Sequence, residues 1–265
     1  MASKFALIGS GRVASHLSEG LVRGGLECIG IWSRALSHAE KLAGRVGASA
    51  FASLDELIVT SRAKGVSFIL ISVSDDAISG VAQSLPRDLT IPAFHTSGST
   101  GIEALEPLVH CGVLYPLQTF SHEREVDLSE VPFFVEYATP EAKEALEMIT
   151  DALRVQEVRL TTSEERLRLH IAAVFGCNFV NHLYALAAKV LRETSISFSA
   201  LEPLLKETLE KALSGDPKRV QTGPAVRRDE RTLTKHVEFL KKEDEDLASL
   251  YTLLSKNIQF LSEEE

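Results

Sequence analysis

A glycine-rich turn near the start of the chain limits the possible folds more than any other feature. Residues 5–8 (FALI) form a short apolar run, and residues 12–23 then place apolar side chains at helical spacing. Between them lies a G-x-G-x-x-A pattern made by Gly9, Ser10, Gly11, Arg12, Val13 and Ala14. A strand, a tight glycine turn and a helix in this order are typical of a dinucleotide-binding Rossmann unit.

Each position of the turn has a physical role in holding a pyrophosphate. Gly9 permits the tight turn, Gly11 lets the backbone approach the anion, and Ala14 lets the helix pack closely on the strand. The free N–H groups at the helix start, from Arg12 and Val13 onward, would donate to the phosphates. The alternative is a Rossmann-like turn without a ligand, but the position at the head of a β-α chain favours binding.

Apolar runs alternate with helical segments over the first 160 residues. The run at 68–73 (FILISV) has no polar break, which favours a central parallel strand covered by helices on both faces. Further short runs lie at 28–32, 51–59, 91–94 and 113–114, with a weak helix expected at 102–109. Residues 133–160 read as an edge extension of the same sheet. The pattern predicts an α/β fold, with a doubly wound Rossmann domain over residues 1–160.

From residue 163 onward the sequence shows only helical periodicity, at 163–193, 199–213 and 229–260. We therefore expect an all-helical domain over residues 161–265. Its first helix begins at a cap-like Ser163 and is apolar around most of its circumference, so it needs apolar partners on several sides. A second copy of the chain is the simplest source of these apolar partners, so we expect a homodimer.

Charge and cysteine content exclude several classes of protein. A net charge of -9 and a pI near 5.5 argue against binding to nucleic acids or to anionic membranes. Three widely spaced cysteines without a C-x-x-C pair fit neither a disulfide framework nor a metal site, which indicates a reducing compartment. No stretch approaches the roughly 18 apolar residues of a membrane span. We expect a cytoplasmic protein that is neither exported nor embedded.

The end of the second predicted strand indicates which dinucleotide is bound. A site that prefers NAD carries an acid there for the adenosine ribose, whereas this strand ends Trp32-Ser33-Arg34. The guanidinium of Arg34 and the hydroxyl of Ser33 suit the 2′-phosphate of NADP. Arg34 as an ordinary solvated charge is the alternative. We predict NADP as the cofactor.

Polar loops follow three of the predicted strands, at the sheet edge where open α/β sheets bind ligands. The polar segment Ser72-Val73-Ser74-Asp75-Asp76 follows the central strand, and its first three residues are expected to contact the cofactor. His95 and Ser97 are candidates to touch the nicotinamide or the substrate, and Tyr115 follows the next strand. A loop that only caps the following helix is the alternative reading of His95 and Ser97. A serine hydrolase is disfavoured, because no G-x-S-x-G pattern is present.

These motifs together resemble a known group of proteins. The sequence resembles Rossmann proteins related to pyrroline-5-carboxylate reductase, ketopantoate reductase and 6-phosphogluconate dehydrogenase, and within them the DUF2520 family. The resemblance covers nearly the whole chain and rests on Gly9–Gly11, Trp32–Arg34, His95–Gly98, Tyr115–Phe120, His170 with Asn178-Phe179, and Gln221–Ala225 with Arg228-Asp229 and His236. It implies a dimeric NADP- or deazaflavin-dependent oxidoreductase whose substrate is not settled.

One departure from the better-known hydroxy-acid relatives concerns the proton donor. Those relatives place a catalytic lysine one turn before an asparagine on the first long helix, whereas here Val174 precedes Asn178. The donor must then be His170, Tyr115, His95 or a water. In a regular α-helix His170 and Asn178 would lie about 12 Å apart along the axis and about 80° apart around it.

The sequence therefore predicts an NADPH-dependent reductase or dehydrogenase acting on a small carbonyl or imine. Its cleft would be lined by His95, Ser97, Tyr115 and Asn178, with His170 a further catalytic candidate. The turn at 222–224 would either close this cleft or simply cap a helix. A non-catalytic NADP-binding sensor or regulatory dimer is the alternative, which the missing lysine favours.

Overall fold

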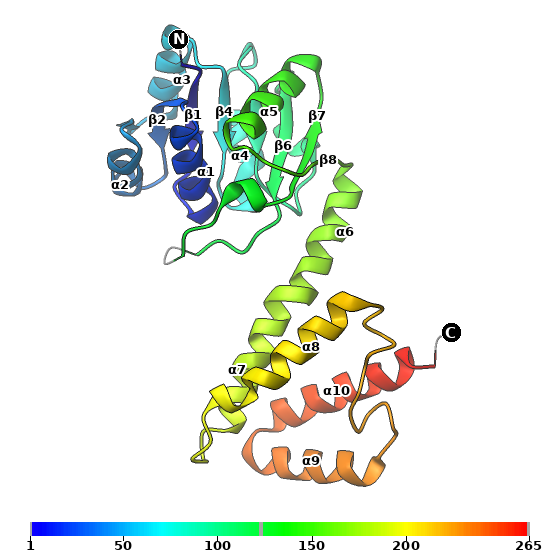
Figure 1. Ribbon diagram of the computed structural model, residues 1–265. Coiled ribbons are helices and arrows are strands. Elements are labelled where there is room, and N and C mark those ends of the chain that lie inside the picture. The colour runs from blue at the N-terminus through cyan, green and yellow to red at the C-terminus, as the bar shows by residue number, and fades with distance from the viewer. Residues whose placement is uncertain (1, 122–123, 264–265) are drawn as a thin grey trace. The chain divides into compact units, whose positions relative to one another are not determined.

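The computed structural model describes residues 2–121 and 124–263. Within this part of the chain, eight strands form one sheet in the order β3-β2-β1-β4-β5-β6-β7-β8 (Figure 1). The strands are β1 (Lys4–Ile8), β2 (Glu27–Trp32), β3 (Ser49–Phe51), β4 (Phe68–Ile71), β5 (Ala93–His95), β6 (Cys111–Pro116), β7 (Phe133–Tyr137) and β8 (Val158–Leu160). The predicted α/β Rossmann fold is confirmed.

Helices connect the strands and make up the rest of the chain. Those of the sheet region are α1 (Arg12–Arg23), α2 (Leu36–Val46), α3 (Leu54–Lys64), α4 (Asp75–Ser84), α5 (Pro140–Ala152) and the short 3₁₀ turns η1 (Ile102–Leu105) and η2 (Leu128–Glu130). A long helix follows as α6 (Ser163–Ala173), a π-helical segment η3 (Val174–Phe179) and α7 (Val180–Val190). The last elements are η4 (Phe198–Leu201), α8 (Glu202–Ser214), α9 (Glu230–Glu243) and α10 (Glu245–Leu261).

The chain divides into two compact units, Met1–Val180 and Asn181–Glu265. The first contains the sheet, its covering helices and the first half of the long helix. The second is entirely helical, as the sequence predicts. The boundary falls inside the long helix, later than the predicted change at residue 160, because α6 contacts the sheet through the side chains of Arg166 and His170.

The two faces of the sheet bury different halves of each strand. In β1, Phe5 and Leu7 pack with α1, α2 and α5, whereas Ala6 and Ile8 pack with α3 and α4 on the other face. Strand β4 alternates in the same way and is buried along its whole length. An unbroken apolar run is what such two-sided cover requires, so FILISV is a central strand as predicted.

The direction of chain crossing changes between β1 and β4. From β1 the sheet grows through β2 to β3, and the chain then returns to the other side of β1 and continues outward from β4. Strands β1 to β6 are parallel, so the carboxyl ends of β1 and β4 lie side by side at this switch point. Open α/β sheets bind their ligands at this place. The edge extension is mixed, because β7 runs antiparallel to β6.

Three local predictions differ from the structure. The cap of α6 is Thr162 rather than Ser163, because Thr162 and Glu165 form a reciprocal capping box. The predicted helix at 229–260 is two helices, α9 and α10, because Asp244 has an extended backbone and its side chain caps α10. The weak helix predicted at 102–109 is only the 3₁₀ turn η1.

The continuous helix Ser163–Val190 is long and apolar enough to cross a membrane by length and composition, among the described residues. The expectation that no such stretch exists is therefore wrong. Polar residues such as His170 and Asn178 interrupt the apolar run but leave its mean hydropathy high. A single helix of this kind is also found in proteins that never enter a bilayer, where other helices cover it.

Candidate functional site

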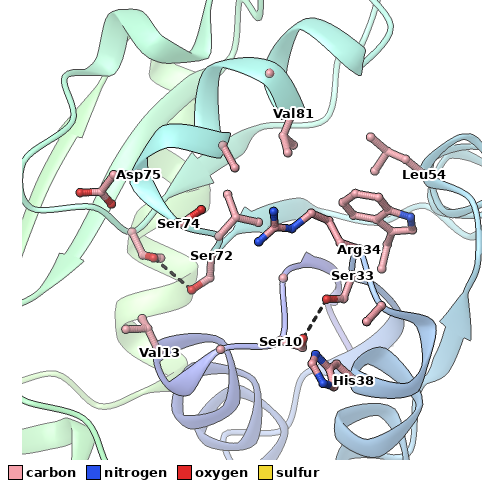
Figure 2. A pocket seen from close by; sticks show the side chains of 18 of the residues that line it. Ser10, Val13, Ser33, Arg34, His38, Leu54, Ser72, Ser74, Asp75 and Val81 are labelled. Atoms are coloured by element: carbon pink, nitrogen blue, oxygen red, sulfur yellow. Dashed lines mark hydrogen bonds between the residues drawn. The ribbon is translucent and has the colours of Figure 1, made fainter.

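A pocket of about 1660 Å³ opens at the switch point, within the first unit (Figure 2). Its walls come from the loops that follow β1, β2, β4 and β5 and from the starts of α1, α2, α3 and α4. The lining includes all ten predicted cofactor residues: Gly9, Ser10, Gly11, Arg12, Val13, Ser33, Arg34, Ser72, Val73 and Ser74. Of the five predicted catalytic residues, Ser97 lines the pocket.

The two glycines of the turn have the different roles that the fingerprint assigns. Gly9 has a φ of +113°, and a Cβ atom there would lie 2.0 Å from the carbonyl oxygen of Ser72. Only glycine fits where β1 and β4 end so close together. A Cβ at Gly11 would meet nothing within 4 Å, so the space above this residue is open. The open space beside the helix start fits a phosphate group of a dinucleotide.

Four helices begin at this pocket, and none of them has a side-chain cap. The N-caps of α1, α2, α3 and α4 are Gly11, Ala35, Ser53 and Ser74, and no side chain accepts a hydrogen bond from their first turns. By contrast, Thr139, Thr162, Asp229 and Asp244 cap α5, α6, α9 and α10. Uncapped helix starts present free N–H donors and partial positive charge, which suit an anionic ligand.

The end of β2 forms one end of the pocket, at the position where dinucleotide-binding Rossmann folds contact the adenosine ribose. The hydroxyls of Ser10 and Ser33 form a hydrogen bond of 2.9 Å, which connects the loop after β1 to the loop after β2. Arg34 and the exposed His38, in the first turn of α2, line the same part of the pocket. Figure 2 shows Arg34 on the opposite side of Ser72 and Ser74 from Asp75. His38 is missed from sequence because a lone histidine carries no motif.

His95 is fully buried and has partners on both ring nitrogens. Its Nδ1 accepts a hydrogen bond from the backbone N–H of Ser97, so its Nε2 carries the proton and faces the carbonyl oxygen of Gly101 at 3.3 Å. Burial, together with the nearby charge of Arg166, lowers the pKa of His95 to about 4. The ring is therefore neutral at pH 7 and fixes the conformation of the loop after β5.

The loop after β5 folds around the hydroxyl of Ser97. The Oγ atom of Ser97 accepts hydrogen bonds from the backbone N–H groups of Ser99 and Thr100, at 3.1 and 3.0 Å. The hydroxyl of Ser99 in turn donates to Asp75 at 2.5 Å. The loop and the start of α4 are therefore joined beside the pocket. Ser97 holds a turn within the loop and does not cap the following helix η1, whose N-cap is Gly101 without a side-chain hydrogen bond.

Tyr115 and His170 form a hydrogen-bonded pair directly behind this loop. The phenol oxygen lies 3.1 Å from Nδ1 of His170, although 55 residues separate the two in sequence. A Cβ at Gly98 would lie 2.6 Å from Cζ of Tyr115 and 2.7 Å from Nδ1 of His170, so the backbone of Gly98 touches both side chains. Burial raises the pKa of Tyr115, and Arg166 opposes this rise. The pair places a phenol and an imidazole in hydrogen-bonding contact beside the loop after β5.

A buried ion pair fixes α6 against the sheet one helical turn before His170. The side chain of Arg166 is fully buried and bonds Glu136 of β7 at 2.5 Å, and it also donates to the carbonyl oxygen of Thr100 at 2.7 Å. Ser163 donates to the same Glu136 oxygen at 2.8 Å. Because Arg166 and His170 are four residues apart, they share one face of α6 and reach the same loop.

The π-helical segment changes how Asn178 is presented. A π turn holds one residue more than an α turn, so residues after it are turned backward by up to about 100°. Asn178 lies inside this segment, so the offset of about 80° from His170 expected for a regular α-helix does not apply to it. Asn178 is exposed in the single chain. The signal for this segment was Gly176 inside an apolar helix.

The structure thus brings His95, Ser97, Tyr115 and His170 into one cluster. Asn178 lies further along the long helix that carries His170. Sequence reasoning missed Arg166 and Glu136 as members of the cluster. Each looked like an ordinary surface charge, because 30 residues separate them. Among the residues that the structure describes, no group of histidine, cysteine or acidic side chains could hold a metal ion.

Comparisons with known proteins agree with this architecture. The Rossmann-like domain model matches residues 2–120, and the model of the domain of unknown function DUF2520 matches residues 131–258. A candidate NADP oxidoreductase from Bacteroides fragilis is 35% identical, with a TM-score of 0.84, over 97% of this chain and 98% of that one. The chain belongs to the DUF2520 family. No curated protein sequence matches it.

More distant structures share the fold of this DUF2520 protein. A reductive aminase from Aspergillus terreus, in complex with NADPH4, cyclohexanone and allyl amine, is 13% identical, with a TM-score of 0.63 over 97% of this chain and 88% of that one. A pyrroline-5-carboxylate reductase from Coxiella burnetii is also 13% identical, with a TM-score of 0.55 over 99% and 100%. These neighbours confirm the predicted relationship at the level of the fold.

Proposed function

We propose that this protein is an NADP(H)-dependent oxidoreductase that transfers a hydride to or from a small carbonyl or imine. The observation that carries the proposal is the set of four uncapped helix starts around one pocket at the switch point. The turn from Gly9 to Val13 would hold the pyrophosphate, and Ser33 and Arg34 the 2′-phosphate. The segment Ser72–Ser74 would line the part of the pocket that holds the nicotinamide ribose.

The choice of NADP over NAD depends on Arg34. In titrations followed by nucleotide fluorescence, NADPH is expected to bind about 10- to 100-fold more tightly than NADH, the range for one hydrogen bond to a charged group. Arg34→Glu should abolish or reverse this preference. Arg87→Glu, an exposed charge change outside the pocket, is the matched control. Equal binding of both nucleotides by the unaltered protein would contradict the NADP assignment.

The catalytic candidates take different roles in this proposal. Tyr115 and His170 exchange the proton, Asn178 contacts the substrate, and Ser97 with His95 holds the loop between them and the cofactor. NADPH consumption with a panel of ketones and cyclic imines tests activity. Tyr115→Phe should lower kcat at least tenfold and leave the Kd for NADPH within about threefold. Tight NADPH binding without turnover of any substrate class would favour the sensor instead.

A homodimer is proposed from the exposed row of apolar side chains on the first half of the long helix. Leu167, Ile171, Phe175 and Phe179 follow one another at intervals of four and are 39 to 65% exposed. A second copy is favoured over a bilayer, because Asn178 and other polar groups on this helix are costly in hydrocarbon. The proposed location is accordingly the cytoplasm.

Sedimentation at low micromolar concentration tests the dimer. Phe175→Asp places a charge in the centre of the row and should give a monomer. Val59→Asp, which alters an equally exposed apolar residue on α3, should leave the dimer intact. A monomeric unaltered protein would refute this part of the proposal.

A further inference from the structure

One charged side chain forms no ion pair among the described residues, at the end of the pocket next to Ser97 (the inner end). Asp75, the first residue of α4, lines the pocket next to Ser72 and Ser74. Among the described residues it forms no salt bridge, and its Oδ2 accepts the Ser99 hydroxyl while Oδ1 has no hydrogen-bond donor. The carboxylate is exposed to the pocket and can accept a further donor.

The cation behind this end of the pocket is already paired, whereas the two arginines that line the pocket belong to its other walls. Arg166, the nearby cation, is fully buried and paired with Glu136. Figure 2 shows Arg34 on the other side of Ser72 and Ser74 from Asp75, and Arg12 begins α1 at the glycine turn. His95 is neutral. The inner end therefore has a net negative charge that comes from Asp75.

The carboxylate also lies within electrostatic reach of the proposed proton-exchange group. Burial raises the pKa of Tyr115, and Asp75 adds to that rise. Burial lowers the pKa of His95, and Asp75 opposes that fall. Asp75 lines the pocket together with Ser97 and accepts the hydroxyl of Ser99. Ser99 follows Gly98, whose backbone touches Tyr115, so the carboxylate lies on the pocket side of the loop that covers the proposed proton-exchange group. A negative charge in that position attracts a cation and repels a developing anion.

We propose that Asp75 is the counter-ion for a positively charged nitrogen of the substrate, so that the site takes a protonated imine in reduction and the corresponding amine in the reverse direction. This inference rests on the proposed oxidoreductase function and narrows its substrate class. It disfavours ketones and aldehydes.

The chemistry of the two substrate classes explains the preference. In reduction of a protonated imine, the imine carbon accepts a hydride from NADPH, the C=N electron pair moves to nitrogen, and NADPH becomes NADP⁺. The positive charge of the nitrogen disappears, and the neutral amine then takes up one proton. A carbonyl oxygen would instead develop a negative charge next to Asp75 and would need a donor to neutralise it. A protonated imine brings its own proton, so the missing lysine before Asn178 is no obstacle.

The competing explanation is that Asp75 only stabilises the start of α4. An acidic residue in the first turn interacts favourably with the helix dipole, and the adjacent Asp76 does so as well. Asp76 does not line the pocket. Asp76→Asn therefore removes the same charge from the same turn and serves as the matched control for Asp75→Asn.

The test measures binding of protonated cyclic amines to the complex with NADP⁺. Pyrrolidinium and piperidinium are titrated by calorimetry against the unaltered protein and both variants, with tetrahydrofuran and tetrahydropyran as neutral analogues of equal size. Asp75→Asn should weaken amine binding about 10- to 100-fold, the range for one hydrogen bond to a charged group, whereas Asp76→Asn should change it less than threefold. Neither variant should change the Kd for NADPH more than threefold.

Three results would overturn the inference: amines that bind no more tightly than the ethers, amine binding unchanged in Asp75→Asn, or an equal loss in both variants. A loss of NADPH binding in Asp75→Asn alone would assign the carboxylate to the cofactor and overturn it as well. Failure of the unaltered protein to bind NADPH is seen before any amine is added. That failure would refute the proposed function itself, and this inference with it.

Discussion

Removal of Arg166 should be among the most destabilising single changes in the first unit. The guanidinium is fully buried, pairs with Glu136 at 2.5 Å and donates to the carbonyl oxygen of Thr100 at 2.7 Å. Arg166→Met keeps much of the volume but leaves a largely buried carboxylate without its cation. Breaking a buried pair in this way costs about 3–5 kcal/mol. For a domain of this size, that corresponds to a fall in Tm of roughly 6 to 20 °C.

A double-mutant cycle separates the pair from the simple loss of packing. In Arg166→Met combined with Glu136→Leu, both charges are gone, so the double variant should be more stable than Arg166→Met by about 2 kcal/mol or more. Lys143→Met is the control, because Lys143 and Glu147 form an exposed pair and its loss should cost less than about 1 kcal/mol. Urea unfolding gives the free energies. Equal costs for Arg166→Met and Lys143→Met would refute the reasoning.

Three further outcomes are expected. Gly98→Ala should lower the free energy of unfolding by about 1–3 kcal/mol, because the added methyl group displaces both rings of the proton-exchange pair. It should also lower turnover more than Tyr115→Phe does. Unfolding curves measure the first effect and NADPH oxidation the second. Gly9→Ala should abolish NADPH binding or soluble expression, since its Cβ would overlap the carbonyl of Ser72. His95 titrates at about 4 in the folded state, against about 6.5 when unfolded, so the unfolded chain binds more protons between these values. Stability should rise by up to about 3 kcal/mol from pH 4 to pH 6.5, and His95→Asn should flatten that rise in urea unfolding curves.

The parts of the fold that could be predicted from sequence are those with a local periodic signal. The run FILISV identified the central strand because two-sided burial removes polar residues from it, and the glycine turn identified the first β-α unit because only glycine fits beside Ser72. The break of the predicted helix 229–260 at Asp244 was not predicted. An acidic residue within a helical pattern is common, and only its extended backbone shows the break.

The candidate site could be predicted only in part, because its important contacts join distant segments. Tyr115 was found from its place after a strand and His170 from the resemblance, but their contact depends on how α6 packs against β6. Arg166 carries no local sign of burial, since it lies among exposed charges of the same helix turn. Asp75 was visible as part of a polar strand end. Its lack of an ionic partner could be judged only after every nearby cation had been placed.

The absent lysine gains a different meaning once these positions are known. Its absence, compared with the hydroxy-acid relatives, was the argument for a non-catalytic sensor. The structure instead shows an elaborate support for Tyr115 and His170, in which a buried ion pair, a neutral histidine and a glycine all fix one small region. Buried polar groups that are merely inherited cost stability unless every member is satisfied. Retaining this arrangement next to an unpaired carboxylate is easier to understand for a site that binds a cationic nitrogen than for a site that only holds a nucleotide.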